Sequence, residues 1–124
     1  LRRRNHAAAY QLYLGEAAGL TLAVEKEYAQ NVYWMFGLLI DPQTCKINRD
    51  ELMVRLKEKE IETRPFFRPN HQQPFLQSLH HYDSGDFPIS VLASERGVYL
   101  PSGSGLTEES IRFVSQQIIE LTKF

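Results

Sequence analysis

The sequence predicts an α+β fold, in which helices pack on a small, mostly antiparallel sheet of three strands. Three observations predict it: one long apolar and aromatic run, two helices with clear start signals, and short strand-like segments between them. The 124 residues have 43% hydrophobic and 23% charged side chains, which is an ordinary globular composition. We therefore expect one domain over residues 1–124, large enough to bury a core.

The first expected element is an amphipathic helix over Leu1–Leu14, ended by Gly15. Its predicted apolar face consists of Ala8, Tyr10, Leu12 and Tyr13. The segment Leu20–Leu22 is a candidate for a short edge strand, which the count of three strands leaves out. The longest strand signal is Asn31–Asp41, which is apolar nearly throughout and is typical of a central strand covered on both faces. Alternation along it would turn one pair of the stripe Tyr33–Phe36 toward a cleft, although a core role is the simpler interpretation.

A second helix is predicted over Asn48–Glu60, because Asn48 and Glu51 have the spacing of a capping box. Its inward side chains would be Leu52, Met53 and Leu56. Apart from the candidate edge strand at Leu20–Leu22, a second strand of the predicted three follows at Ile61–Phe67, with Pro65 indicating an edge position or the strand's end.

Residues 68–86 form an irregular stretch that holds three of the four histidines, with a short helix near residues 75–79. Stretches of this length in compact domains are usually functional or mobile. We expect a helix over Phe87–Arg96, a short strand at Val98–Leu100 and a turn at residues 101–105. The inward side of that helix would be Ile89, Leu92 and Ala93.

The last helix is expected over Thr107–Thr122, with Thr107 as its N-cap. Its apolar residues recur at spacings of three and four, which predicts one buried stripe. That stripe is Ile111, Val114, Ile118 and Leu121.

Charge and cysteine content exclude several classes of protein. Fourteen basic against fifteen acidic residues give a net charge of −1, whereas a nucleic-acid binder is normally far more basic. The basic run Arg2–Arg4 is therefore better explained as a solvated helix face or a contact to another domain. A single cysteine, Cys45, excludes an internal disulfide framework and favours a reducing, cytoplasmic setting. The longest apolar run, Tyr33–Ile40, is too short to span a bilayer.

The densest group of reactive side chains lies in the segment Thr63–Pro74. It combines a guanidinium, two phenyl rings, an imidazole and a carboxamide, which together suit a polar, phosphorylated ligand. The simpler alternative is that Phe66 and Phe67 fill the core while Arg64 pairs with a glutamate.

Three other candidate sites have weaker support in the sequence. The histidines 71, 80 and 81 lack the spacing of a metal motif. Cys45 has no placed base to make it a nucleophile. The tripeptide at residues 103–105 precedes a helix start, but two glutamates there would repel an anion.

Four runs carry a family resemblance: NVYWMFGLLID, RDELMVRLKEKEIETRPFF, PNHQQPF and YLPSGSGLTEESIRFV. In this order and spacing they are similar to the C-terminal small domain of the DegT/DnrJ/EryC1/StrS aminotransferases. These are pyridoxal-phosphate enzymes that aminate keto-sugars attached to nucleotides. The runs around TRPFF and LPSG are most similar to the perosamine synthetases.

The resemblance implies a fold-type I enzyme whose large domain, absent here, holds pyridoxal phosphate on a Schiff-base lysine. None of the lysines at positions 26, 46, 57, 59 and 123 has a similar context, so we expect no cofactor on this fragment and no activity from it alone. The start without Met, inside a helix, agrees with a piece of a longer chain.

The resemblance also implies substrate contact by Arg64, Phe66, Phe67, His71 and Gln73, which match the family's pattern along this segment. The domain would supply a wall of the substrate pocket and contacts in a homodimer, with a nucleotide-sugar substrate and glutamate as amino donor. Asn70 and Gln72 are more polar than the family's usual residues, and the tract HHYDSGD has no counterpart to draw on.

Two other functions remain open from the sequence. One is a stand-alone sugar-nucleotide-binding or regulatory module without catalysis. The weaker one is RNA contact through Arg2–Arg4, which the near-neutral charge disfavours. Separation from a partner domain would also leave an apolar patch around the first helix and residues 66–75.

Overall fold

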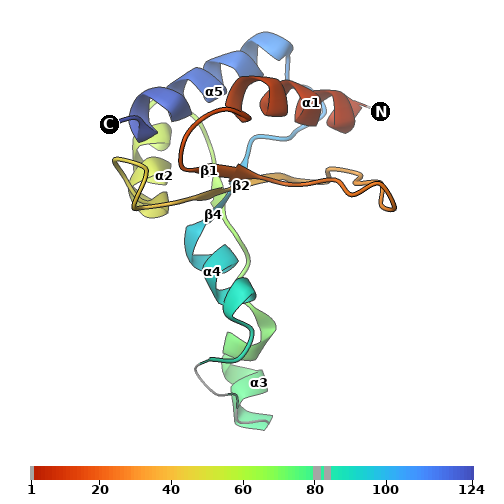
Figure 1. Cartoon of the computed structure of the whole chain (residues 1–124), viewed down its shortest axis with the longest axis vertical. Coiled ribbons are helices and arrows are strands. Elements are labelled where there is room, and N and C mark those ends of the chain that lie inside the picture. The colour runs from red at the N-terminus through yellow and green to blue at the C-terminus, as the bar shows by residue number, and fades with distance from the viewer. Residues whose placement is uncertain (1, 80–81, 83–84) are drawn as a thin grey trace.

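The computed structural model describes residues 2–79, 82 and 85–124, and it confirms the α+β class. The helices are α1 (Arg2–Leu14), α2 (Arg49–Glu58), α3 (Pro74–Leu79), α4 (Pro88–Arg96) and α5 (Glu108–Thr122), with a 3-10 turn, η1, at Asn70–Gln72. The strands are β1 (Leu20–Leu22), β2 (Phe36–Ile40), β3 (Arg64–Pro65) and β4 (Gly97–Leu100). Figure 1 shows α1, α2 and α5 on one side of the sheet and α3 and α4 on the other.

The sheet has four strands in the order β1-β2-β4-β3, and every pair is antiparallel. The expected count of three strands was wrong, because Leu20–Leu22 pairs along its whole length with Leu38–Ile40 of β2. The central pair aligns Phe36 with Leu100 at one end and Leu39 with Gly97 at the other.

Two strands are shorter than the sequence indicated. Tyr33 has a φ of 47°, so the backbone leaves the extended region and the expected strand Asn31–Asp41 pairs only over β2. The expected strand Ile61–Phe67 reduces to β3, beyond which the Phe66 N–H donates one further bond to the Gly97 carbonyl at 3.0 Å.

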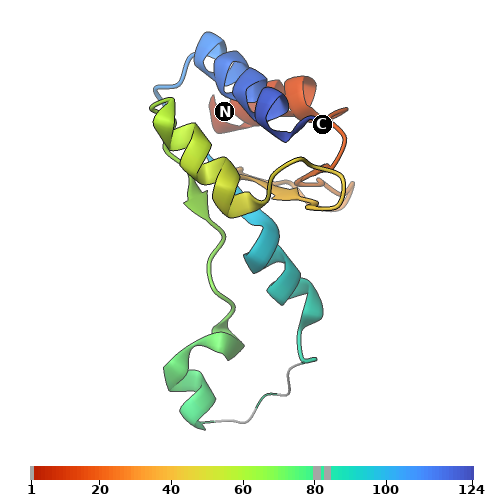
Figure 2. The same cartoon turned by 90° about the vertical axis from the view of Figure 1, so that its left-hand side faces the viewer.

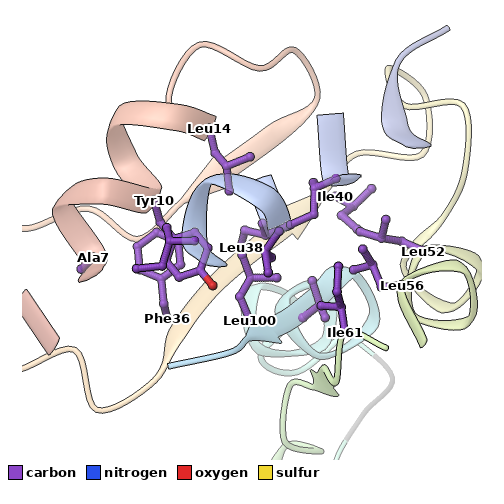
Figure 3. Packing of buried hydrophobic residues seen from close by; sticks show 14 of the residues in the cluster. Ala7, Tyr10, Leu14, Phe36, Leu38, Ile40, Leu52, Leu56, Ile61 and Leu100 are labelled. Carbon is purple, nitrogen blue, oxygen red and sulfur yellow. The ribbon is translucent and has the colours of Figure 1, made fainter. Parts of the chain in front are cut away.

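The main core lies between the sheet and α1, α2 and α5. Alternate residues of β2 and β4 point into it, and Figure 3 shows several of them meeting side chains from α1 and α2. The strand residues buried there are Phe36, Leu38, Ile40, Val98 and Leu100. Because this face carries most of the buried apolar area, it holds the domain together.

The buried stripe of helix α1 agrees with the expected one at Tyr10 and Tyr13 and differs at the other positions. Ala7, Tyr10 and Leu14 are buried, whereas Ala8 is exposed and Leu12 is 75% exposed. Tyr10 stacks on the Phe36 ring at 4.8 Å, and its hydroxyl donates to the Pro101 carbonyl at 2.9 Å. Burial raises the pKa of this phenol.

Helices α2 and α5 begin where their signals predicted. Asn48 and Glu51 form the reciprocal capping box, and the Thr107 hydroxyl accepts from the Ser110 N–H. The stripe of α5 is confirmed: Ile111, Val114 and Ile118 are buried and Leu121 is half-buried. In α2, Leu52 and Leu56 are buried and Met53 is half-buried.

The segment from β3 to α4 leaves the body of the domain and extends away from the second sheet face (Figures 1 and 2). We call residues 66–96 the arm. Helix α4 returns to the sheet, where Arg49 Nη1 donates to the carbonyls of Ser94 and Gly97 at 3.1 Å each. Ile89 was expected to face inward but is 76% exposed, because this helix projects from the sheet.

Of the two places where an apolar patch was expected, the arm carries several exposed large hydrophobic side chains and α1 carries one among the described residues. Phe67 and Phe75 are 64% and 71% exposed, with Leu79 and Phe87 also exposed nearby in the sequence, whereas on α1 the exposed large hydrophobic residue is Leu12.

The long connection from β1 to β2 is tied to α1 by two arginines. Arg4 binds both carboxylate oxygens of Glu25, at 2.7 and 2.9 Å, and also donates to the Asn31 carbonyl. Arg3 donates to the Trp34 carbonyl. The bonds from Arg4 and from the Asn31 N–H lower the pKa of Glu25 to about 2.

No helix in the described part of the chain combines the length and the apolar character needed to cross a bilayer.

Replacement of Asn48 tests the capping box. Asn48→Ala removes the acceptor for the Glu51 N–H and should lower the free energy of unfolding by about 1 kcal/mol in urea denaturation. Asn48→Asp keeps a capping oxygen and should retain most of the stability. Equal losses in the two variants would contradict the role of the cap.

The acid side of the stability curve tests the Arg4–Glu25 pair. Because the folded pKa of Glu25 lies below its ordinary 4.5, its stabilisation is complete above pH 4.5 and is lost as the pH falls to about 2. The difference in unfolding free energy between wild type and Glu25→Gln should therefore be constant above pH 4.5 and close toward pH 2. Glu27→Gln, at an exposed neighbouring carboxylate, should leave the slope unchanged. Parallel curves for wild type and Glu25→Gln would show that the pair is not formed.

Candidate functional site

A cavity of about 530 Å³ opens where the arm meets the second face of the sheet. We call it the arm pocket. Its walls come from the segment after β3, from η1, from α4 and from β4. Six of its lining residues carry aromatic rings, namely Phe66, Phe67, His71, Tyr82, Phe87 and Tyr99. Three of the five predicted substrate contacts are among them: Phe66, Phe67 and His71.

The Phe66 ring lies directly on the backbone of two neighbouring strands. A Cβ atom added to Gly37 on β2 would come within 2.5 Å of the ring, and one added to Gly97 on β4 within 2.3 Å. These two glycines therefore form a socket for the Phe66 ring, and any larger residue at either position would clash with that ring. The same ring stacks on Tyr99, with centroids 4.3 Å apart and an angle of 18°.

The socket decides between the two interpretations of the phenylalanines. Phe66 is half-buried and packs on the sheet, as the simpler alternative expected. Phe67 is 64% exposed, with its ring tilted at 5.6 Å from Tyr99, so it does not fill the core. The structure thus gives Phe66 a packing contact and leaves the Phe67 ring accessible from the pocket.

The outer wall of the arm pocket is a second aromatic group. The His71 ring lies 5.0 Å from Phe87 and 6.1 Å from Tyr82, and those two rings are 6.1 Å apart. Phe87 has a φ of 55°, a left-handed conformation that is rare for a bulky side chain, and it immediately precedes Pro88 at the start of α4.

Polar groups line the rest of the pocket. Arg68, Asn70, Ser90 and Ser94 contribute, and the lining contains no carboxylate among the described residues. Gln73 acts on the turn itself: its Nε2 donates to the Arg68 carbonyl at 3.4 Å. The arm pocket thus combines accessible rings with a guanidinium and an imidazole.

Arg64 lies in a different cavity. This cavity, of about 1060 Å³, runs between the edge strand β3 and α5, and we call it the edge groove. Its charged lining residues are Lys59, Glu60, Glu62, Arg64 and Glu109. The structure therefore separates Arg64 from the arm pocket, and substrate contact by it stays a prediction, as it does for the other four residues.

A model of the DegT/DnrJ/EryC1/StrS aminotransferase family matches residues 1–119. The chain belongs to this family. It is 36% identical over 104 residues to the GDP-perosamine synthase of Vibrio cholerae, which covers 82% of this chain and 28% of that protein. The resemblance found in the sequence is thereby confirmed.

Solved structures of sugar aminotransferases share the fold. DesV of S. venezuelae, in complex with a ketimine intermediate, superposes with a TM-score of 0.82 at 25% identity. DesI, crystallised with its TDP-sugar product, gives 0.81 at 26% identity. Each comparison covers 96% of this chain and 30% of the other. The chain thus spans under a third of the length of these relatives.

The residues of this family member do not fit the Schiff-base site of pyridoxal phosphate. All five lysines lie within the described ranges, at positions 26, 46, 57, 59 and 123, and each is exposed. A Schiff-base lysine needs a pocket that desolvates its amine and holds the cofactor's phosphate. The expectation that this chain binds no cofactor by itself stays a prediction.

The weaker sequence candidates find structural roles or lie outside the description. Cys45 is buried, and burial raises the pKa of its thiol, which disfavours a nucleophile. His80 and His81 lie outside the described residues. Among the residues that are described, no three His, Cys, Asp or Glu side chains lie together as a metal site would require. Two residues of the basic run, Arg3 and Arg4, bond within the fold, which further weakens the RNA interpretation.

The aromatic stripe is arranged differently from a regular strand. Tyr33 and Phe36 are both buried, Trp34 is 63% exposed, and Met35 lines the edge groove. The left-handed backbone at Tyr33 breaks the alternation of a regular strand. The first and last residues of the stripe are therefore buried together, and the two between them are not. The tripeptide at 103–105 contributes Gly103 and Gly105 to the same groove.

Sequence reasoning missed Tyr82, Phe87 and Tyr99 as lining residues and the two glycines as a socket. The glycines did leave a signal, because an isolated glycine within a strand often marks the close approach of another group. The sequence signal for Phe87 was weaker: it precedes a proline, which restricts its backbone. Tyr99 left none, because its neighbours come from segments distant in the sequence.

Alanine at either socket glycine should displace the Phe66 ring. Gly37→Ala and Gly97→Ala should each lower the free energy of unfolding by about 1–3 kcal/mol, as overpacked cores do. Gly103→Ala is the matched control, since a Cβ there meets nothing within 4 Å. NMR shifts of the Phe66 and Tyr99 rings would report the displacement. Unchanged shifts in both socket variants would show that the ring does not occupy the socket.

Proposed function

We propose that this chain is the C-terminal small domain of a longer pyridoxal-phosphate aminotransferase that aminates a nucleotide-linked keto-sugar, as perosamine synthases do. The observation that carries the proposal is the family match over residues 1–119, together with a chain that equals under a third of its relatives' length. The substrate would be a GDP-linked sugar, by analogy with the Vibrio cholerae relative.

In this proposal the domain binds and orients substrate while the chemistry takes place beside it. Pyridoxal phosphate would supply an electron sink from the large domain, with glutamate as amino donor. His71 and Arg68 offer hydrogen-bond donors to an anionic substrate, and the accessible Phe67 ring offers a flat apolar surface. Positioning of this kind contributes to rate by holding the reacting groups together.

The exposed arm supports a contact role as well. Phe75, Leu79 and Ile89 are 71%, 57% and 76% exposed on the two arm helices, more apolar surface than a short helical segment usually leaves in water. We propose that the large domain or the second subunit of a homodimer covers these side chains. The enzyme would act in the cytoplasm.

A second function, a binding or regulatory module without catalysis, is supported by the closed main core. Three helices cover one sheet face, and the core residues come from both ends of the chain, so the domain has the packing to fold without a partner. Such a module would still use the arm pocket for a sugar nucleotide.

Binding of a sugar nucleotide to the chain tests the site that both functions share. GDP-mannose should shift the NMR signals of the arm pocket, and His71→Gln should weaken binding about 10-fold by removing the imidazole. His6→Gln, on α1 across the sheet, is the matched control and should bind as wild type does. Equal affinity in wild type and His71→Gln would remove His71 from the site, and absence of binding would overturn the arm pocket as a substrate site.

The absorbance spectrum of the whole gene product separates the two functions. An aminotransferase purified with pyridoxal phosphate should show the visible band of the bound cofactor, and glutamate should change it. Sugar-nucleotide binding without any such band would favour the module.

A further inference from the structure

Both ends of the arm meet the rest of the domain at one backbone carbonyl. Gly97, the first residue of β4, accepts two hydrogen bonds there: the Phe66 N–H donates at 3.0 Å and Arg49 Nη1 donates at 3.1 Å. Phe66 begins the arm, and Gly97 directly follows the arm's last residue. We call this junction of Phe66, Ser94, Gly97 and Arg49 the arm root.

Arg49 is the member of the arm root that comes from another part of the fold. It is the first residue of α2, and only 15% of its side chain is exposed. The same Nη1 donates to the Ser94 carbonyl at 3.1 Å, and Nε donates to Asp50. Ser94 lies in the last turn of α4, where carbonyls lack partners within the helix and the helix dipole attracts a cation. Arg49 therefore caps the C-terminal end of α4 from α2.

The rest of the arm has no comparable attachment among the described residues. Phe87, the N-cap residue of α4, makes no side-chain capping bond and has a left-handed backbone. Neither α3 nor α4 buries a residue fully, and Phe75 and Ile89 are exposed. Helix α4 packs on β2 and β4, and beyond that contact the arm projects away from the sheet (Figure 2). The direction of the arm is therefore set at its root.

A second arginine near the root makes a weaker contact. Arg96, the last residue of α4, approaches Asp41 at 3.5 Å, and both side chains are more than a third exposed. Exposed ion pairs at such a distance contribute little because water screens them. Arg49 differs because its guanidinium is mostly out of water and donates to two carbonyls, and hydrogen bonds from a charged donor are stronger in such surroundings.

A small change of angle at the arm root becomes a large displacement at the far end of α4. The helix has nine residues and is about 13 Å long, so a tilt of about 10° would move its start by about 2 Å. Phe87 stands at that start, and its ring lies 5.0 Å from the His71 ring in the wall of the arm pocket. Displacements of about 1 Å in a binding wall are enough to slow a reaction about 100-fold.

We infer that Arg49 is a positioning residue, which sets the direction of the arm against the sheet and thereby the place at which the arm holds substrate. Arg49 does not line the arm pocket. It acts through Ser94, which lines the pocket and whose carbonyl it binds. The inference rests on the proposed function and deepens it.

The direction of the arm can be measured in the 124-residue chain by residual dipolar couplings of the α4 amides, referred to those of α5. Arg49→Met keeps the apolar stem, removes the donors and should change the couplings of α4. Arg49→Lys keeps the positive charge and should change them less. The matched control is Arg55→Met, which removes an equal charge from the same helix at a side chain that is 62% exposed, and it should leave them unchanged.

Unchanged couplings of α4 in Arg49→Met would overturn the inference. Circular dichroism and the couplings of α5 check that each variant is folded. If Arg49→Met does not fold, Arg49→Gln is the second variant, because its neutral and shorter side chain also removes the charge from the arm root.

Kinetics of the whole gene product separate positioning from stability. Arg49→Met should raise the KM for a GDP-linked keto-sugar about 10-fold, since the arm then holds that substrate in the wrong place. The absorbance change that glutamate causes should stay as in wild type, because glutamate reacts at the cofactor of the large domain. Arg49→Lys should recover part of the lost KM, and Arg55→Met should behave as wild type does.

The outcomes distinguish the inference from the proposed function. An unchanged KM, or an equal loss of the sugar and glutamate reactions, would leave Arg49 a stabilising residue only and overturn its positioning role. A wild-type gene product without a cofactor band would overturn the proposed function and, with it, the substrate role of Arg49. The dipolar couplings of the 124-residue chain would still report whether Arg49 directs the arm.

Discussion

The position of the arm depends on the close approach of one ring to two strands. Phe66 can lie on the sheet only because Gly37 and Gly97 leave their Cβ positions empty on adjacent strands. The contact fixes the chain just as it leaves β3, before the segment that carries Phe67 and His71. Arg49 holds the other end of the arm by bonding the carbonyls of Ser94 and Gly97 where α4 meets β4.

These two attachments explain how a domain with its main core on one face can form a pocket on the other. The helices α1, α2 and α5 supply the packed face, and their burial stabilises the sheet. The second face is left with glycines and Tyr99, a surface suited to hold a protruding segment rather than another helical layer. The arm pocket therefore belongs to the junction and not to the core.

Much of the fold followed from local patterns. The capping box at Asn48, the N-cap at Thr107 and the stripe of α5 were predicted because each depends on residues within one or two turns. The apolar face of α1 was predicted only in part: Tyr10 and Tyr13 do pack on the core, but Ala7 and Leu14 are buried there in place of Ala8 and Leu12. The sheet was expected to have three strands, and β1 was not counted among them. A segment of three residues is too short to be recognised as a strand from its sequence, and it becomes one by pairing with β2.

The sequence by itself determined the family, the helices with caps and the segment that holds Phe67 and His71, because such signals reside in neighbouring residues. Only the tertiary structure decided which of these side chains share a pocket. It placed Arg64 in the edge groove, and it brought Phe87 and Tyr99 into the lining of the arm pocket together with His71. The reason is physical: strand pairing and the glycine socket bring together residues that no local spacing connects.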